Sequence, residues 1–334
     1  MEFHELAALS SGHVAARALQ TAVKLGLFDK LAEAEATAAA LAQRLSCEPR
    51  ALALLANALV ALELLEKRDD RYALAPVARR FLVGSAADYF GAMVLFEERL
   101  FALWARLEAS VRSGRPARTA DSFQGERGET ELFIAAMDDL VRARGDARFL
   151  AERLDLGAVG LLADIGGGPG TYVVEFLRRW PGMRAVVYDL PGTLEVSRAI
   201  LKRNAPWALE RLALREFDYH TQEIPEPADA ILLSNVIHLE DEQTCALLAQ
   251  KCFRALNPGG LFLIKDHIMN EALTEPVAGA LFSLQLLLTT RGRDYSFKEV
   301  TAWLARAGFA APTLSRLPFP PFTSSVASAR KPAD

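Results

Sequence analysis

The sequence has few cysteines and no segment that suits a membrane or an export pathway. Its 334 residues include three cysteines, Cys47, Cys245 and Cys252, which lack metal-binding spacing. This scarcity indicates a reducing compartment, and we expect a cytoplasmic protein. No apolar run approaches the roughly 20 residues that span a bilayer, and the first six residues lack the basic start of a signal peptide. We therefore expect no membrane partner.

An excess of positive charge is also missing. The chain carries 38 Lys and Arg residues against 42 Asp and Glu residues, a formal net charge of −4. Proteins whose main partner is nucleic acid usually carry a basic surface, so we expect no nucleic-acid partner. Hydrophobic residues make up 51% of the chain, which is ample for a packed interior. The length favours one large domain and a smaller one.

A glycine-rich turn stands at the centre of the remaining signals. The apolar run Leu161–Ile165 is typical of a strand buried on both faces. Gly166, Gly168 and Gly170 follow in alternation, and Thr171 begins a helical pattern. Glycine permits positive φ and a close approach of a ligand to the backbone, and the N–H groups at a helix start attract anionic or polar groups. The stretch therefore predicts a ligand-binding loop.

Two acids indicate which ligand binds. The first strand ends in Asp164, whose charge would repel a pyrophosphate but suits a ligand with an ammonium and a sulfonium. A second predicted strand ends about twenty residues on in Asp189, where an acid accepts hydrogen bonds from ribose hydroxyls. These features resemble motifs I and II of the class I S-adenosylmethionine (SAM) methyltransferases. An NAD-dependent dehydrogenase is the alternative, although its last glycine would fall one place later.

The chain from residue 151 alternates strands with helices, which predicts a parallel sheet with helices on both faces. The predicted strands are 161–165, 185–189, 212–218, 228–234 and 261–266, with a turn at 257–260 and two further strand-like segments at 313–317 and 324–329. Ligands bind beyond the carboxyl ends of such strands. These ends hold Asp164, Asp189, Asp218, His238 and Asp266.

The N-terminal part follows a winged-helix pattern, two helices and then a small hairpin. A DNA-binding regulator is therefore one alternative. However, the helix predicted from about Arg50 to Leu65 is rich in alanine and leucine and has few side chains that could reach DNA. We expect it to be buried, more plausibly against another subunit.

Two helical stretches, Tyr89–Val111 and Glu129–Leu150, follow the winged-helix pattern. A helical bundle that joins two domains often forms one wall of a ligand pocket. Arg144 in the second stretch is a candidate to bind the cofactor's carboxylate, and a solvated arginine is the alternative.

The whole chain resembles the small-molecule O-methyltransferases typified by the caffeic acid and hydroxyindole enzymes and their bacterial antibiotic-pathway relatives. Residues 184–191 (Arg-Ala-Val-Val-Tyr-Asp-Leu-Pro) resemble the family's second motif, residues 257–260 its turn before strand five, and residues 325–330 its last strand. The resemblance implies a winged-helix dimerisation domain (1–105), linking helices that contribute to the substrate pocket (106–150) and a Rossmann-like SAM-binding domain (151–334). The last would be doubly wound, with a mostly parallel seven-stranded sheet.

The resemblance also implies site residues. The cofactor set comprises Asp164, Gly166, Gly168, Gly170, Asp189, Leu190, Asp218, Tyr219 and Ser234, together with the candidate Arg144. Within it, Asp189 would bind the ribose and Asp218 the adenine amino group. The substrate pocket would be formed by Phe101, Trp104, Phe133, Met137, Phe282 and Leu286.

The resemblance implies a catalytic role for three residues, each at a position where the family has a catalytic residue. His238 falls where the family has its general base, Asp266 where it has an acid beside that histidine, and Asp294 where it has a second acid. A hydroxyl is a poor nucleophile until it is deprotonated, and imidazole titrates near working pH. A carboxylate on the other ring nitrogen fixes the tautomer. The pair Leu239-Glu240 replaces the family's usual Asp-Trp after the histidine, so the substrate side differs from that of the best-known members.

We therefore predict a homodimeric, SAM-dependent methyltransferase that acts without a metal on a hydroxyl of a small aromatic natural product. S-adenosylhomocysteine (SAH) would be its product. The alternatives are a SAM-dependent C- or N-methyltransferase, and a non-methylating SAM-binding relative such as a hydroxylase or cyclase. The winged-helix regulator is a more distant one.

Overall fold

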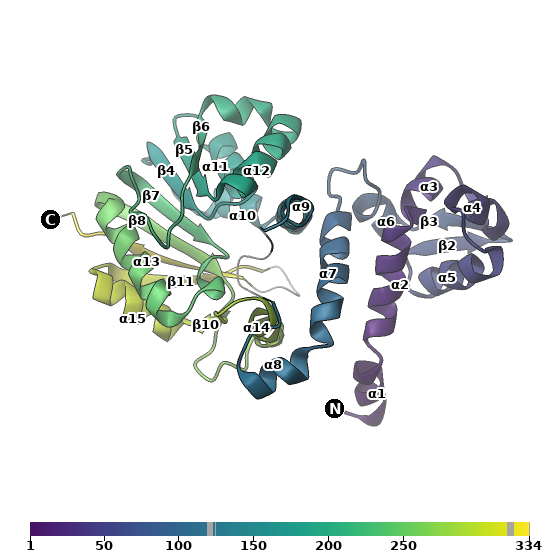
Figure 1. Ribbon diagram of the computed structural model, residues 1–334. Helices are drawn as coiled ribbons and strands as arrows, with labels where there is room; N and C mark the ends of the chain where they lie inside the picture. Colours follow the sequence, from purple (N-terminus) through teal and green to yellow (C-terminus); the bar gives the residue numbers. More distant parts are fainter. Residues whose placement is uncertain (119–122, 124, 319–323, 334) are drawn as a thin grey trace. The chain divides into compact units, whose positions relative to one another are not determined.

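In the computed structural model, which describes residues 1–118, 123, 125–318 and 324–333, the predicted strand before the glycines lies inside a large sheet. This strand, β4 (Leu161–Ile165), pairs in parallel with β5 (Arg184–Asp189) and β7 (Ala228–Ser234). The other strands are β6 (Leu212–Glu216), β8 (Leu256–Asp266), β11 (Ala310–Arg316) and β12 (Ser325–Arg330). Over the described residues the sheet has seven strands, in the order β11-β12-β8-β7-β4-β5-β6 (Figure 1).

The strand directions explain where ligands can bind. β4, β5, β6, β7 and β8 run parallel to one another, so their carboxyl ends share one edge of the sheet. β12 is antiparallel to β8, and β11 is antiparallel to β12. The prediction of a doubly wound, mostly parallel seven-stranded sheet is therefore confirmed.

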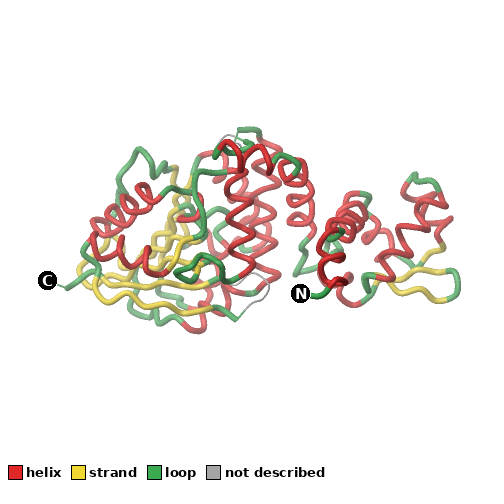
Figure 2. The backbone as a smooth tube through the Cα atoms, turned by 90° about the horizontal axis from the view of Figure 1, so that it is seen from below, coloured by secondary structure: helices red, strands yellow, loops and turns green. Residues whose placement is uncertain are grey.

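Alternate residues of the strands enter two separate cores. On one face, Leu162 packs with helices α10 (Asp146–Arg153), α11 (Thr171–Arg179) and α12 (Pro191–Asn204). On the other face, Ala163 and Ile165 belong to the core formed with α13 (Glu242–Ala255) and α15 (Phe297–Ala307). Figure 2 shows helices on both sides of these strands. Because both faces are covered, the central strands β4 and β7 are mostly apolar and buried.

The chain divides into two units, Met1–Phe101 and Ala102–Asp334. The first has its own core, with Leu27, Leu41, Leu59 and Tyr72 among its fully buried side chains. Its elements are α1 (Phe3–Ser10), α2 (His13–Lys24), α3 (Leu27–Glu33), β1 (Ala36–Thr37), α4 (Ala38–Leu45), α5 (Pro49–Ala61), β2 (Leu65–Arg68), β3 (Arg71–Leu74) and α6 (Pro76–Phe81). Helices followed by a β2–β3 hairpin match the predicted winged-helix pattern. In the described part of the chain, no helix is both long and apolar enough to cross a bilayer.

The helix predicted from about Arg50 to Leu65 ends at Ala61, and Leu65 begins β2. Three further predicted elements differ from the structure. The stretch expected to be helical over 89–111 is two helices, α7 (Gly91–Trp104) and α8 (Leu107–Ser113). The stretch expected over 129–150 is also two helices, α9 (Arg127–Arg144) and α10, because Gly145 adopts a positive φ of 74°.

The third difference concerns the predicted turn at 257–260, which belongs to β8. The β7–β8 register shifts between Ala228 and Ala230, and Gly259 has a φ of 75°. An irregular stretch of strand therefore takes the place of a separate turn.

Candidate active site at the carboxyl edge of the sheet

The glycine loop joins the end of β4 to the start of α11. Gly166, Gly168 and Gly170 have φ angles of 67°, 53° and 77°. Residues with a side chain rarely adopt such positive φ angles, so this loop conformation favours glycine at these positions. The Gly168 N–H donates to Asp189 Oδ2 at 2.8 Å, which ties the loop to the end of β5.

Asp189 organises two backbone groups while remaining partly exposed. Its Oδ1 accepts the N–H of Leu190 at 2.8 Å, and its Oδ2 accepts that of Gly168. Burial raises the pKa of Asp189, and the two N–H groups act in the opposite direction. Each carboxylate oxygen has further lone-pair capacity, so the side chain can still accept bonds from a ligand.

Asp164 is a buried acid whose hydrogen-bonding capacity is unused. It is 1% exposed, and within the described residues neither of its oxygens has a hydrogen-bond partner. Burial, followed by the charge of Asp189, raises the pKa of Asp164 to about 8. A Cβ at Gly167 would lie 2.6 Å from its Oδ2, so this carboxyl lies directly against the glycine loop. An unsatisfied buried acid at this place fits a cationic ligand group.

Arg144 ends α9 and is buried, which rules out the solvated alternative. Its side chain is 9% exposed, and its Nη2 lies 2.5 Å from Asp146 Oδ2 as an ion pair. Its Nε and Nη2 make no hydrogen bond of acceptable geometry in the described part of the chain. Tyr172, in the first turn after the glycine loop, donates its hydroxyl to the same Asp146 oxygen at 2.8 Å.

A second cation, which the sequence analysis did not single out, adjoins this cluster. Lys265 is fully buried in β8, 3.5 Å from Asp146, and donates to Asn235 Oδ1 at 3.0 Å. Burial, with repulsion from Arg144, lowers the pKa of Lys265 to about 8. Two cations therefore surround one carboxylate. A buried excess of positive charge is costly, so the cluster fits a ligand carboxylate that would balance it.

The other predicted cofactor residues follow β6 and β7. Asp218 binds its own turn, accepting from the N–H of His220 and the hydroxyl of Thr221, each at 2.9 Å. Tyr219 donates its hydroxyl to Glu240 at 2.6 Å. Ser234 ends β7, and its hydroxyl is buried without a hydrogen-bond partner among the described residues.

His238 and Asp266 form a buried pair at the ends of β7 and β8. His238 lies in the short 3₁₀ turn Ile237–Leu239, and its Nδ1 is 2.6 Å from Asp266 Oδ1. Burial alone would lower the pKa of His238, but the charge and hydrogen bond of Asp266, with nearby Asp294, raise it. Burial opposes ionisation of Asp266, but the influence of His238 prevails and lowers the pKa of Asp266. The geometry thus suits an imidazole that accepts a proton.

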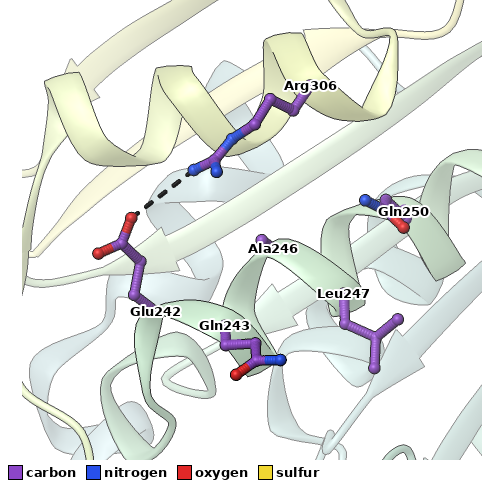
Figure 3. A pocket seen from close by; sticks show the side chains of 6 residues that line it. All are labelled: Glu242, Gln243, Ala246, Leu247, Gln250 and Arg306. Carbon is purple, nitrogen blue, oxygen red and sulfur yellow. Dashed lines mark ion pairs between the residues drawn. The ribbon is translucent and has the colours of Figure 1, made fainter.

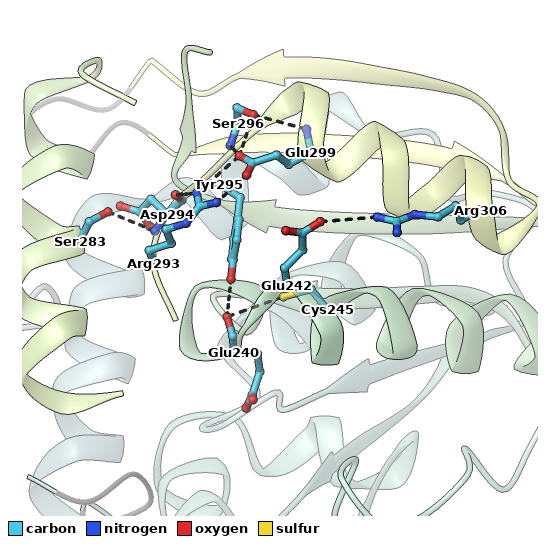
Figure 4. Close-up of polar contacts among 10 residues, drawn as sticks. All are labelled: Glu240, Glu242, Cys245, Ser283, Arg293, Asp294, Tyr295, Ser296, Glu299 and Arg306. Atoms are coloured by element: carbon cyan, nitrogen blue, oxygen red, sulfur yellow. Dashed lines mark hydrogen bonds and ion pairs between the residues drawn. The ribbon is translucent and has the colours of Figure 1, made fainter. Parts of the chain in front are cut away.

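Asp294 reaches the same place from the loop before β10 (Tyr295–Ser296). It is 1% exposed, and its N–H donates to Ser283 Oγ of α14 (Val277–Thr289) at 3.1 Å (Figure 4). Burial, then the charge of Asp266, raises the pKa of Asp294 to about 8. The surroundings therefore shift the pKa values of the two acids in opposite directions, downward for Asp266 and upward for Asp294.

Polar contacts anchor the loop that carries Asp294. The Tyr295 hydroxyl donates to the carbonyl of Glu240 at 2.6 Å, and Arg293 pairs with Glu299 at 2.5 Å. Ser296 caps α15 through Glu299, as Figure 4 shows. The Tyr295 bond links the loop to the end of the turn that holds His238, and the contacts with Glu299 link it to α15.

His238, Asp266 and Asp294 each have one side-chain atom that could coordinate a metal, and these three atoms all lie within 4.8 Å of one another. This spacing would also suit a metal ion. The absence of a metal therefore stays a prediction.

The predicted substrate-pocket residues differ in what they contact. Phe282 packs edge-on against His238, with ring centroids 5.1 Å apart, and Leu286 is buried one turn further along α14. Phe133 and Met137 lie one turn apart on α9, partly buried, and Trp104 ends α7. Phe101, in the first unit, is 41% exposed and lies under the guanidinium of Arg17.

Two surface depressions in the described structure lie elsewhere. Figure 3 shows the first, lined by α13 side chains and by Arg306 of α15, which pairs with Glu242 at 3.6 Å. The second is lined by residues 223–227 and the end of α13. Neither depression is lined by a predicted site residue. The candidate active site is therefore located by its functional side chains at the carboxyl ends of the parallel strands.

Comparison with known proteins identifies the family. The sequence matches the O-methyltransferase domain over residues 104–310 and the O-methyltransferase dimerisation domain over residues 7–84. The chain belongs to the S-adenosylmethionine-dependent O-methyltransferase family. It is thus an enzyme whose cofactor is SAM, which decides against the dinucleotide and regulator alternatives.

Individual relatives cover nearly the whole chain. The 3-hydroxy-5-methyl-1-naphthoate 3-O-methyltransferase of Streptomyces sahachiroi is 33% identical over 305 residues, covering 90% of this chain and 87% of that protein. The N,N-dimethyltransferase OxyT of Streptomyces rimosus is 31% identical over 316 residues, covering 90% and 89%. The crystal structure of human N-acetylserotonin methyltransferase in complex with SAM superposes with a TM-score of 0.88 at 25% identity, covering 99% of this chain and 97% of that one.

Proposed function

We propose that this O-methyltransferase methylates a hydroxyl group of a small aromatic natural product, with His238 as general base. The observation that carries the proposal is the buried His238–Asp266 pair at the carboxyl edge of the sheet, with the Phe282 ring packed against the imidazole. An aromatic side chain beside a proton acceptor suits a phenol-like acceptor, because the ring is packed while the hydroxyl reaches the base.

The cofactor is proposed to lie along the carboxyl ends of β4, β5, β6 and β7. When bound, SAM supplies a methyl group on a positively charged sulfur. Gly166, Gly168 and Gly170 would leave room for it, and Asp189 would accept from the ribose hydroxyls. Asp164 would face the ammonium and Arg144 the carboxylate. Leu190, Asp218, Tyr219 and Ser234 complete the proposed set.

The protein's own contribution is alignment and proton handling. Asp266, ionised, accepts from His238 Nδ1–H, so that Nε2 presents its lone pair to the acceptor hydroxyl. As the methyl group is transferred, the hydroxyl proton moves to that Nε2. Asp266 then stabilises the imidazolium, and Asp294, the second acid beside it, completes the proposed catalytic set. We propose that Trp104, Phe133, Met137 and Leu286 contact the substrate together with Phe282.

The test is methyl transfer from SAM to a library of phenols, followed by mass spectrometry. We expect mono-methylated phenols from the wild-type enzyme, almost none from His238→Ala, and the same rate in the presence of EDTA. A panel of aromatic amines tests the second candidate, N-methylation, which is favoured by the similarity to an N,N-dimethyltransferase. Methylation of amines alone, at equal rates in both proteins, would contradict the proposed function.

Arg144→Gln is expected to weaken SAH binding by about 10-fold or more, because one charge-assisted hydrogen bond to the ligand carboxylate is lost. Its matched control is a second ligand, 5′-methylthioadenosine, which lacks the amino-acid part. Titration calorimetry should give the same affinity for this ligand in both proteins. A parallel loss for both ligands would indicate a general disturbance of the buried Asp146 cluster.

Gly292→Ala is expected to lower turnover by about 10-fold or more. A Cβ at this position would lie 2.2 Å from the carbonyl oxygen of His238 and 2.6 Å from the backbone nitrogen of Glu240. The added methyl must therefore displace either the His238 turn or the Asp294 loop, and small displacements of reacting groups are costly. Gly182→Ala is the control, because its Cβ would meet no atom within 4 Å. Equal turnover of the two variants would contradict this prediction.

We also propose that the enzyme is a homodimer assembled through its first unit. The support is the match to the O-methyltransferase dimerisation domain over residues 7–84. Light scattering should give twice the chain mass. A cytoplasmic location is proposed because Cys47, Cys245 and Cys252 are all free thiols.

A further inference from the structure

A second imidazole, His267, lies beside the proposed base. Its backbone N–H donates to Asp266 Oδ1 at 2.8 Å, the same oxygen that lies 2.6 Å from His238 Nδ1. Both imidazole rings pack edge-on against Phe282, with centroid distances of 5.1 Å and 5.0 Å. The Asp266 carboxylate and the Phe282 ring therefore each contact both histidines, which lie side by side. Each histidine side chain is 9% exposed.

The second acid faces the second histidine. Asp294 Oδ2 lies 3.7 Å from His267 Nδ1. Within the described residues, neither Asp294 oxygen nor His267 Nδ1 has a hydrogen-bond partner, although all three atoms are buried. A buried polar atom without a hydrogen-bond partner lowers the stability of the fold. Each of these two side chains is therefore a suitable partner for the other. The separation of 3.7 Å is longer than a hydrogen bond, so the two side chains are neighbours without being bonded.

The protonation states decide which atom donates. Burial raises the pKa of Asp294 to about 8 and lowers the pKa of His267 to about 3. At neutral pH the carboxyl of Asp294 therefore largely keeps its proton while the ring is neutral. A protonated Asp294 that faces Nδ1 favours the tautomer in which the ring proton of His267 is on Nε2.

The neighbouring acid favours the opposite tautomer in His238. The pKa of Asp266 is lowered, and an ionised Asp266 at 2.6 Å favours a proton on Nδ1, which leaves the lone pair on Nε2. The two rings on Phe282 therefore offer different groups, an acceptor on His238 and a donor on His267. A ligand that satisfies both needs a hydroxyl and, beside it, a second oxygen that accepts a hydrogen bond.

We propose that His267 is a substrate-recognition residue that selects aromatic acceptors with two oxygen substituents on neighbouring carbons. One is the hydroxyl that gives its proton to His238, and the other accepts a hydrogen bond from His267 Nε2–H. This inference rests on the proposed methylation of a hydroxyl and defines the acceptor more closely. His267 takes no part in the bond changes.

The test compares two ligands of similar shape on the SAH-loaded enzyme, 2-methoxyphenol and 2-ethylphenol. Only the first has an oxygen beside the hydroxyl. We expect it to bind about 10-fold more tightly to the wild type, the effect of one hydrogen bond that would otherwise be unmade. The preference should disappear in His267→Leu. It should partly return in His267→Gln, whose amide N–H can donate. Equal affinities in the wild type, or an undiminished preference in His267→Leu, would overturn the inference.

Two further measurements separate this result from a failure of the proposed function. SAH affinity and the unfolding midpoint should be unchanged in the His267 variants, which shows that the fold and the cofactor site are intact. If phenols are methylated but the two ligands bind alike, the inference alone is wrong. If SAH does not bind the wild type, the proposed function is wrong. Should His267→Leu not fold, the comparison in the wild type and in His267→Gln still decides.

Discussion

Replacing His238 with alanine is expected to reduce kcat by about 10²- to 10⁴-fold, the usual contribution of a positioned general base. A neutral hydroxyl attacks the methyl group poorly, and the variant lacks the imidazole that is proposed to accept its proton. Asp266 keeps a hydrogen bond from the N–H of His267 in the variant, so the end of β8 should retain its shape. SAH affinity, measured by calorimetry, should therefore remain within about twofold of the wild type.

The proposed role of His238 also predicts how activity depends on pH. The base works only when neutral, so kcat/KM should fall as the pH drops below the pKa of His238. That pKa is raised by Asp266 and Asp294 against the effect of burial, so the fall should be centred above the usual value of about 6.5. Asp266→Asn removes the main raising influence and should move the fall to lower pH while also lowering kcat.

His220→Ala provides the matched control. This histidine is 46% exposed and lies 3.3 Å from Glu240, outside the proposed proton path. It should leave the profile unchanged. A profile of the wild type that is flat from pH 5 to 9, or a His238→Ala enzyme of normal rate, would show that the acceptor needs no base.

The parts of the site that the sequence predicts best are those encoded by neighbouring residues. The glycine loop is consecutive, so its positive φ angles and its place between β4 and α11 follow from residues 161–171. Asp189 ends the next strand, and parallel pairing of β4 with β5 brings it to Gly168. The proximity of His238 and Asp266 similarly requires that β7 and β8 are neighbours, with Ser234 opposite Lys265.

The sequence does not predict contacts that depend on side-chain direction across separate elements. His267 was missed because only the fold of the loop before β10 places Asp294 against its ring. Lys265 had a local signal, since a lysine in an otherwise apolar strand buried on both faces needs a partner. The helix break at Gly145 also had a local signal, because a glycine inside a helical pattern often marks a helix end. The ion pair of Arg144 with Asp146, by contrast, depends on the helix break that this glycine produces.

Replacing Asp189 with alanine is expected to have the other large effect, a loss of SAH affinity of about 100-fold or more. Two consequences combine. The ribose hydroxyls lose a charged acceptor, and hydrogen bonds to charged groups contribute about 1.5–3 kcal/mol each. In addition, the N–H groups of Gly168 and Leu190 lose the carboxylate that accepts from both of them. The glycine loop would then have to be ordered by the ligand itself, at the expense of affinity.

Asp229→Ala separates these two consequences from a general loss of stability. Asp229 is likewise an aspartate of this sheet that accepts two backbone N–H groups, those of Gly160 and Leu161 at 3.0 Å and 2.9 Å, but at the start of β4. Its loss should lower the free energy of unfolding while leaving SAH affinity nearly unchanged. If instead both variants weaken SAH equally, the effect of Asp189→Ala would arise from stability alone. A loss of affinity confined to Asp189→Ala, with similar urea midpoints for both proteins, would show that this carboxylate acts at the cofactor site, by direct contact or by ordering the glycine loop.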